Sequence, residues 1–124
     1  MSTIEIAAKR WSQALDEFSA IHEGWLVSLE ILSPSFGAQP EITNLPLLGV
    51  PVEPHGAAIA IAVAQSAVDH IAHMVQAPAR VWMERIDSGA EAALEIESAD
   101  GTKTILRLKT AAPPETVDGV ARGP

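Results

Sequence analysis

The 124-residue sequence contains no cysteine and no tyrosine, and basic side chains are scarce. Without cysteine, disulfide bonds, thiolate nucleophiles and zinc–thiolate sites are excluded. The 8 lysine and arginine residues are outnumbered by 16 acidic residues, so the formal net charge is −8. Nucleic acids and anionic membrane surfaces are bound through clustered basic residues, so we expect neither as a partner. Such an acidic balance is typical of a chain kept soluble by its charge.

Long apolar runs are missing too. The most apolar stretch, residues 57–64, is far shorter than the ~20 residues that a helix needs to cross a bilayer. Residues 1–5 show no basic segment followed by an apolar one, so no signal peptide is predicted. We therefore expect a cytoplasmic protein.

The length and the 48% hydrophobic fraction predict one folded domain. A chain of this size buries roughly 65–70% of its extended surface, which is enough for one core. Pro113 and Pro114 end the last predicted strand. We expect a single α+β domain over residues 1–112 and a flexible C-terminal tail over residues 113–124.

The clearest pattern lies in residues 91–110, where two alternating runs flank Asp100 and Gly101. Asp-Gly adopts the positive φ of a tight reversal, so a β-hairpin is predicted. The side chains expected to point inward are Leu94, Ile96, Leu106 and Leu108. The charged side chains expected to pair across the solvated face are Glu95 and Glu97 on one arm, and Lys103, Arg107 and Lys109 on the other.

Residues 8–23 carry the one clear helix pattern, with Gly24 where a left-handed cap would end it. Its apolar stripe consists of Trp11, Ala14, Leu15, Phe18 and either Ile21 or His22. Residues 25–32 then alternate as a strand. The inward face of that strand is Trp25, Val27, Leu29 and Ile31.

The middle of the chain is harder to interpret. Residues 33–40 are predicted as a loop, and the prolines of residues 41–54 exclude a central strand while allowing short edge strands or an extended arm. Residues 47–50 are the piece best suited to pair. In residues 57–75, isoleucine and valine alternate with alanine, which favours a strand, although 19 residues without glycine or proline also suit a helix. We favour two strands broken near residues 65–69.

Under that interpretation, the second face of the first of these strands is nearly all alanine, which suits close approach of a helix or a neighbouring subunit. Residues 80–86 predict a further strand, whose two faces are hard to rank. The fold class is α+β: one N-terminal helix packed on a bent or barrel-like antiparallel sheet of about six strands. No strand–helix–strand alternation is present, so a parallel sheet is not expected.

Five stretches carry a resemblance to known proteins: residues 16–19, 22–30, 78–82, 93–102 and 114–119. Among them are His-Glu-Gly-Trp-Leu-Val-Ser-Leu-Glu at 22–30 and Pro-Ala-Arg-Val-Trp at 78–82. They resemble one family of short, uncharacterised bacterial proteins, a domain of unknown function. The resemblance implies a bacterial, cytoplasmic protein with strands at 57–75, and it brings no reaction, cofactor or catalytic residue. Residues 57–64 are where this chain departs most from the family.

Histidines are the candidate metal ligands. His70 and His73 beside Asp69 would form a weak site only if they converged, and residues three apart on a strand point to opposite faces. We predict no metal and no other cofactor. His22 ends the predicted helix, where we expect its ring to interact with the last carbonyls rather than to catalyse.

No residue is predicted to be catalytic. Glu30, Glu95 and Glu97 suit cross-strand ion pairs better than acid–base chemistry. Trp25 and Trp82 are expected in the core; the alternative is an aromatic wall of a ligand groove or interface, with Arg80 nearby for an anionic group.

Two functional hypotheses follow. The first is a small non-catalytic domain that binds another protein or a second copy of itself. The second is a small-ligand carrier or an enzyme with a pocket between helix and sheet.

Overall fold

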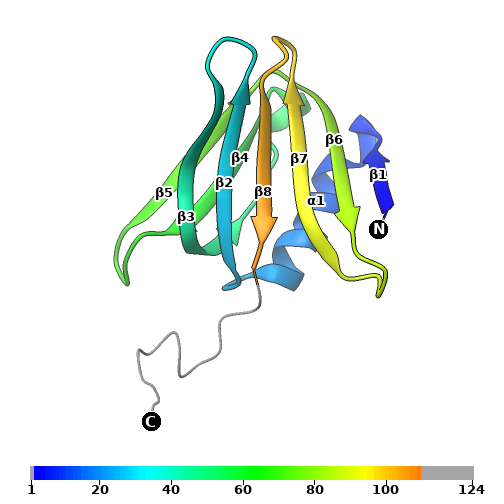
Figure 1. Ribbon diagram of the computed structural model, residues 1–124. Coiled ribbons are helices and arrows are strands. Elements are labelled where there is room, and N and C mark those ends of the chain that lie inside the picture. Colours follow the sequence, from blue (N-terminus) through cyan, green and yellow to red (C-terminus); the bar gives the residue numbers. More distant parts are fainter. Residues whose placement is uncertain (1, 110–124) are drawn as a thin grey trace.

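The computed structural model describes residues 2–109 (Figure 1). The elements in chain order are β1 (Ser2–Ile6), a 3₁₀ turn η1 (Ala8–Arg10), α1 (Trp11–His22), β2 (Leu26–Ser33), β3 (Gly37–Gly49), a 3₁₀ turn η2 (Pro54–Gly56), β4 (Ala58–Ala64), β5 (His70–Gln76), β6 (Pro78–Arg85), β7 (Glu91–Ser98) and β8 (Lys103–Leu108). The predicted tail, residues 113–124, and the predicted end of the domain at residue 112 lie outside the described residues. No helix within residues 2–109 is long and apolar enough to cross a membrane.

The strands form one antiparallel sheet in the order β1-β6-β7-β8-β2-β3-β4-β5. The prediction of one N-terminal helix on a bent antiparallel sheet is confirmed (Figure 1). The number of about six strands is wrong, because the sheet has eight, and it is open rather than a closed barrel, with β1 and β5 at its two ends. The unexpected strand is β1, which pairs with the distant β6.

The core lies between the concave side of the sheet and α1. Trp11, Leu15 and Phe18 of the helical stripe are buried, and His22 is buried with them. In the predicted hairpin, Leu94 and Ile96 are fully buried, as is Leu106, while Leu108 packs at the edge of the core. Burying a side chain of this size contributes roughly 1.5–3 kcal/mol, so the amphipathic helix and the hairpin stabilise each other.

The middle of the chain differs from the prediction. The expected loop over residues 33–40 is too long, because β3 begins at Gly37 and continues to Gly49 between β2 and β4. Both Pro40 and Pro46 lie inside this strand. They are tolerated because residues 37–46 pair with β2 alone, and β4 pairs only with the end of the strand at Leu47 and Gly49.

Residues 57–75 form two strands, as predicted, with β4 and β5 in register from Ala58 opposite Gln76 to Ala64 opposite His70. The predicted charge pairs of the last hairpin are confirmed in part. Lys103 contacts Glu95 at 3.8 Å between Nζ and Oε2, whereas Arg107 pairs with Glu30 of β2 at 3.6 Å. These carboxylates therefore serve cross-strand pairing on the solvated face.

Candidate functional site

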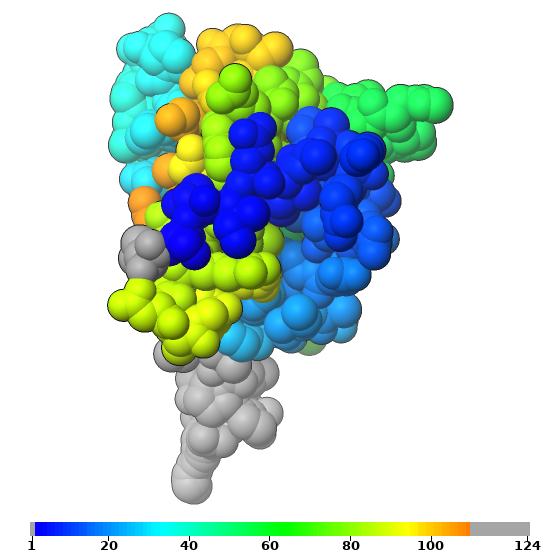
Figure 2. Space-filling view, turned by 90° about the vertical axis from the view of Figure 1, so that its right-hand side faces the viewer, coloured from blue at the N-terminus to red at the C-terminus, as the bar shows by residue number. Residues whose placement is uncertain are grey.

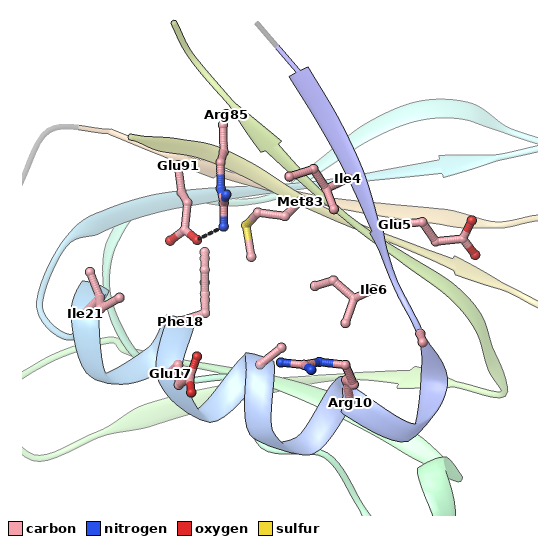
Figure 3. Close-up of a pocket in the computed structure, with 12 residues that line it drawn as sticks. Ile4, Glu5, Ile6, Arg10, Glu17, Phe18, Ile21, Met83, Arg85 and Glu91 are labelled. Carbon is pink, nitrogen blue, oxygen red and sulfur yellow. Dashed lines mark ion pairs between the residues drawn. The ribbon is translucent and has the colours of Figure 1, made fainter. Parts of the chain in front are cut away.

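A cleft of about 470 Å³ lies between β1 and α1. On this face of the molecule β1, α1 and the turn from β6 to β7 meet (Figure 2). The close-up in Figure 3 shows β1 along one side of the cleft and α1 along the other. The cleft is thus a gap between the end of the sheet and the helix.

Two contacts position β1 at this place. Its residues pair with β6 in a regular register, with Ile4 opposite Met83 and Ile6 opposite Val81. The Trp11 indole Nε1–H donates a hydrogen bond of 2.9 Å to the Ile6 carbonyl, which holds the turn from β1 into the helix. Because Trp11 itself is buried, the entry to α1 is anchored in the core.

Seven of the twelve residues that line the cleft are apolar and five are charged. Phe18 and Met83 form buried parts of its lining, and Ile6 lies beside them (Figure 3). At the rim, Ile4 and Ile21 are 45% and 63% exposed. A cleft of this volume with apolar walls and a few polar groups is typical of a small-ligand site.

One end of the cleft holds a chain of charged and polar contacts from three elements. Arg85 Nη2 of β6 lies 3.5 Å from Glu91 Oε2 of β7, and Glu91 Oε1 lies 3.4 Å from His22 Nε2 of α1. The His22 Nδ1–H donates a hydrogen bond of 2.8 Å to the Phe18 carbonyl. Since a carbonyl only accepts, the hydrogen of this bond is on Nδ1.

This end also contains an unsatisfied group. Among the described residues, Arg85 Nε is the one buried side-chain nitrogen or oxygen without a hydrogen-bond partner. The Arg85 side chain as a whole is 42% exposed. Its guanidinium is therefore only partly neutralised by Glu91.

The other end of the cleft presents Arg10, whose guanidinium points into the hollow (Figure 3). Within residues 2–109, no hydrogen bond or ion pair engages this guanidinium. The nearby acidic residues are placed differently: Glu5 points away from the cleft, and the Glu17 carboxylate accepts a hydrogen bond of 3.4 Å from Gln13. Arg10 is thus a cation available at the edge of an apolar cleft.

Of the predicted site residues, Arg80 and Trp82 lie two residues apart on one face of β6, whereas Trp25 lies in another part of the structure. Trp25 packs edge-on against His22, with ring centroids 4.7 Å apart, and lines a smaller hollow that shares Arg85 and Glu91 with the main cleft. Trp82 lies on the opposite face of β6 from the buried Val81 and Met83.

Arg80 lies two residues before Trp82 on the same outer face, opposite Glu97 in register. A ligand or interface role for Arg80 and Trp82 stays a prediction.

The histidines are dispersed. His70 lies opposite Ala64 and His73 opposite Ile61, so the two rings occupy opposite faces of β5. In the described part of the chain, no group of three histidine or acidic side chains is placed to hold a metal ion. His22 is the last residue of α1, as predicted, but its ring bonds to the Phe18 carbonyl four residues earlier rather than to the last carbonyls of the helix.

The hypothesis of a pocket between helix and sheet did not name the residues of this cleft, because its two ends depend on β1 and on contacts between distant segments. The alternation of Thr3, Ile4, Glu5 and Ile6 was the signal available for the missed strand. No local sequence pattern distinguished Arg10, Arg85 and Glu91 from other charged residues on the surface.

Comparisons with known proteins assign the chain to a family. Residues 2–117 match the model of a family of unknown function, DUF5335, and the chain belongs to that family. An uncharacterised protein of the bacterium Aquifex aeolicus (strain VF5) is 30% identical over 113 residues, which cover 91% of this chain and 97% of the relative. No solved structure matches the chain significantly. The predicted resemblance to an uncharacterised family is therefore confirmed.

Proposed function

We propose that this protein is a non-catalytic binding domain whose cleft between β1 and α1 takes a small ligand with an apolar body and a carboxylate. The observation that carries the proposal is the Arg10 guanidinium, which is directed into the cleft and unengaged by residues 2–109. An arginine presents several hydrogen-bond donors in a planar fork that matches a carboxylate.

The charge distribution supports an anionic ligand in spite of the acidic net charge. Glu91 is already engaged by His22 and Arg85, and Glu5 points away from the hollow. The apolar lining formed by Ile6, Phe18 and Met83 suits an aliphatic or aromatic body. Trp25 adjoins the Arg85 end and would contribute an aromatic wall to a longer ligand.

The test is an NMR titration of the protein with octanoate, with octylamine as a probe of the same length and opposite charge. Octanoate is expected to shift the signals of Ile6, Ala14 and Met83. Replacing Arg10 by glutamine should weaken octanoate binding roughly tenfold or more, because a charge-assisted hydrogen bond contributes about 1.5–3 kcal/mol. Lys9→Gln is the matched control, since it removes the neighbouring positive charge outside the cleft.

Three outcomes would overturn the proposal. The first is that octanoate leaves the cleft signals unchanged. The second is that octylamine binds more tightly than octanoate. The third is that Lys9→Gln and Arg10→Gln weaken binding equally, which would mean that net charge rather than a built site attracts the probe.

A further inference from the structure

The far end of the sheet differs from the cleft end in its chemistry. The terminal strand there is β5, His70–Gln76, which among residues 2–109 pairs with β4 alone. Its seven residues include no Asp, Glu, Lys, Arg, Pro or Gly. Natural edge strands are usually protected from pairing with other chains by charge, proline, bulges or short length, and β5 has none of these protections in its sequence.

Charged residues are also rare in the part of the chain that contains β5. Apart from three histidines, residues 54–79 contain a single acidic or basic side chain, Asp69, although the whole chain carries a formal net charge of −8. The acidic residues that keep two copies apart in solution therefore lie elsewhere. Two copies meeting at β5 bring together uncharged strands and avoid most of this repulsion.

Apolar side chains are exposed beside this edge. In the register of β4 and β5, Ala60 lies opposite Met74 and Ala62 opposite Ala72. Ala72 is exposed, Met74 is 41% exposed, and Leu48 at the end of β3 is 43% exposed, whereas Ala60 is already buried. The accessible apolar side chains therefore lie on the terminal strand itself and on β3.

The other end of the sheet lacks this combination. There β1 is shorter, with five residues, and carries Glu5 next to its central residue Ile4. Two copies of β1 paired in antiparallel fashion would bring these negative charges close together. Self-pairing is thus disfavoured at β1 and unopposed at β5.

From these observations we infer that a second copy of this chain pairs with β5 in antiparallel fashion across a two-fold axis, forming a sheet continuous through both subunits. An antiparallel strand edge is self-complementary under a two-fold rotation, because the same donors and acceptors meet with their roles exchanged. This inference is independent of the proposed ligand site, which lies at the opposite end of the sheet.

The test is sedimentation analysis of the full chain over a range extending to high micromolar concentration. The wild-type protein should sediment with twice the chain mass of 13.1 kDa. Met74→Lys should weaken dimerisation at least about tenfold, because lysines on paired strands repel each other. Thr3→Lys is the matched control: it adds the same charge to β1, and the dimer should persist.

A second variant, Ala72→Lys, guards against a local folding defect in Met74→Lys, and circular dichroism establishes that each variant is folded. Slowed amide exchange in β5 on raising the wild-type concentration is expected as well. A wild-type protein that stays monomeric throughout the range would overturn the inference. So would a dimer that both folded β5 variants leave intact, or one that Thr3→Lys disrupts equally.

Discussion

His22 and Glu91 tie the end of the helix to the start of β7, with 3.4 Å between the imidazole Nε2 and the carboxylate Oε1. The His22 side chain is 3% exposed and the Glu91 side chain 16%. On its other side, the carboxylate faces Arg85 of β6. The Glu91 carboxylate thus joins α1, β6 and β7 at one end of the cleft.

Replacing Glu91 by alanine is expected to lower the free energy of unfolding by about 2 kcal/mol, because a buried histidine nitrogen loses its partner. Arg85 would lose its partner as well. Urea unfolding at neutral pH measures the effect. Glu95→Ala on the same strand is the control: its exposed pair with Lys103 should contribute less than about 1 kcal/mol. Equal losses for the two variants would contradict a structural role for the contact.

Ser19 links the helix to the chain that follows β3. Its hydroxyl donates to the Leu15 carbonyl at 2.7 Å and accepts from the Val50 N–H at 2.8 Å. Since Val50 is fully buried, Ser19→Ala leaves its N–H unsatisfied, and we expect a loss of about 1–3 kcal/mol in thermal or urea unfolding.

Ser12→Ala is the matched substitution on the exposed face of the same helix, and it should change stability by less than about 0.5 kcal/mol. If both serine variants were equally stable, the bond to Val50 would contribute little.

The parts of the fold that follow from local pattern were predictable. The helix needed only its stripe from Trp11 to His22, and the last hairpin needed only alternation around Asp100-Gly101. In both cases the residues that specify the element are neighbours in the chain. The two strands within residues 57–75 belong to the same class.

The parts that depend on distant partners were not predictable. Among the described residues, strand β1 pairs only with the distant β6, so its short alternating pattern had no visible counterpart nearby. The prolines of β3 argued against a central strand, and only the arrangement of the sheet shows that Pro40 and Pro46 lie where a single neighbour is present. The cleft was hard to predict for the same reason, since its Arg10 and Arg85 side chains come from separate elements.

The turn of the last hairpin yields a prediction about pH. The Asp100 carboxylate accepts a hydrogen bond of 2.9 Å from the Thr102 N–H, and this bond, together with one from the Thr102 side chain, lowers the pKa of Asp100. NMR titration should give a lower midpoint for Asp100 in the folded chain than in the urea-unfolded chain.

Because the pKa is lower in the folded state, the carboxylate stabilises the fold above the unfolded pKa, and this contribution is lost as pH falls through the folded value. Asp100→Asn should remove this part of the pH dependence while keeping an oxygen that can accept from Thr102. A folded-state midpoint equal to or above the unfolded one would contradict the assignment.

Ala14 is the residue that most directly connects the cleft to stability. It is half-buried on α1, lines the cleft, and leaves space that a larger side chain would occupy. Ala14→Leu is expected to raise the free energy of unfolding by about 0.5–1 kcal/mol, because it buries additional apolar surface without disturbing the core. The same variant should abolish the octanoate-induced shifts, since the added side chain fills the binding volume.

Ala20→Leu, on an exposed position of the same helix, is the control for the change in helix composition, and it should leave octanoate binding intact. The free energy of unfolding reports on packing, and the octanoate-induced shifts report on binding. A more stable Ala14→Leu that still binds octanoate would place the probe elsewhere on the surface. A destabilised Ala14→Leu would mean that the walls at Ile6 and Phe18 are too close together to accept a ligand without rearrangement.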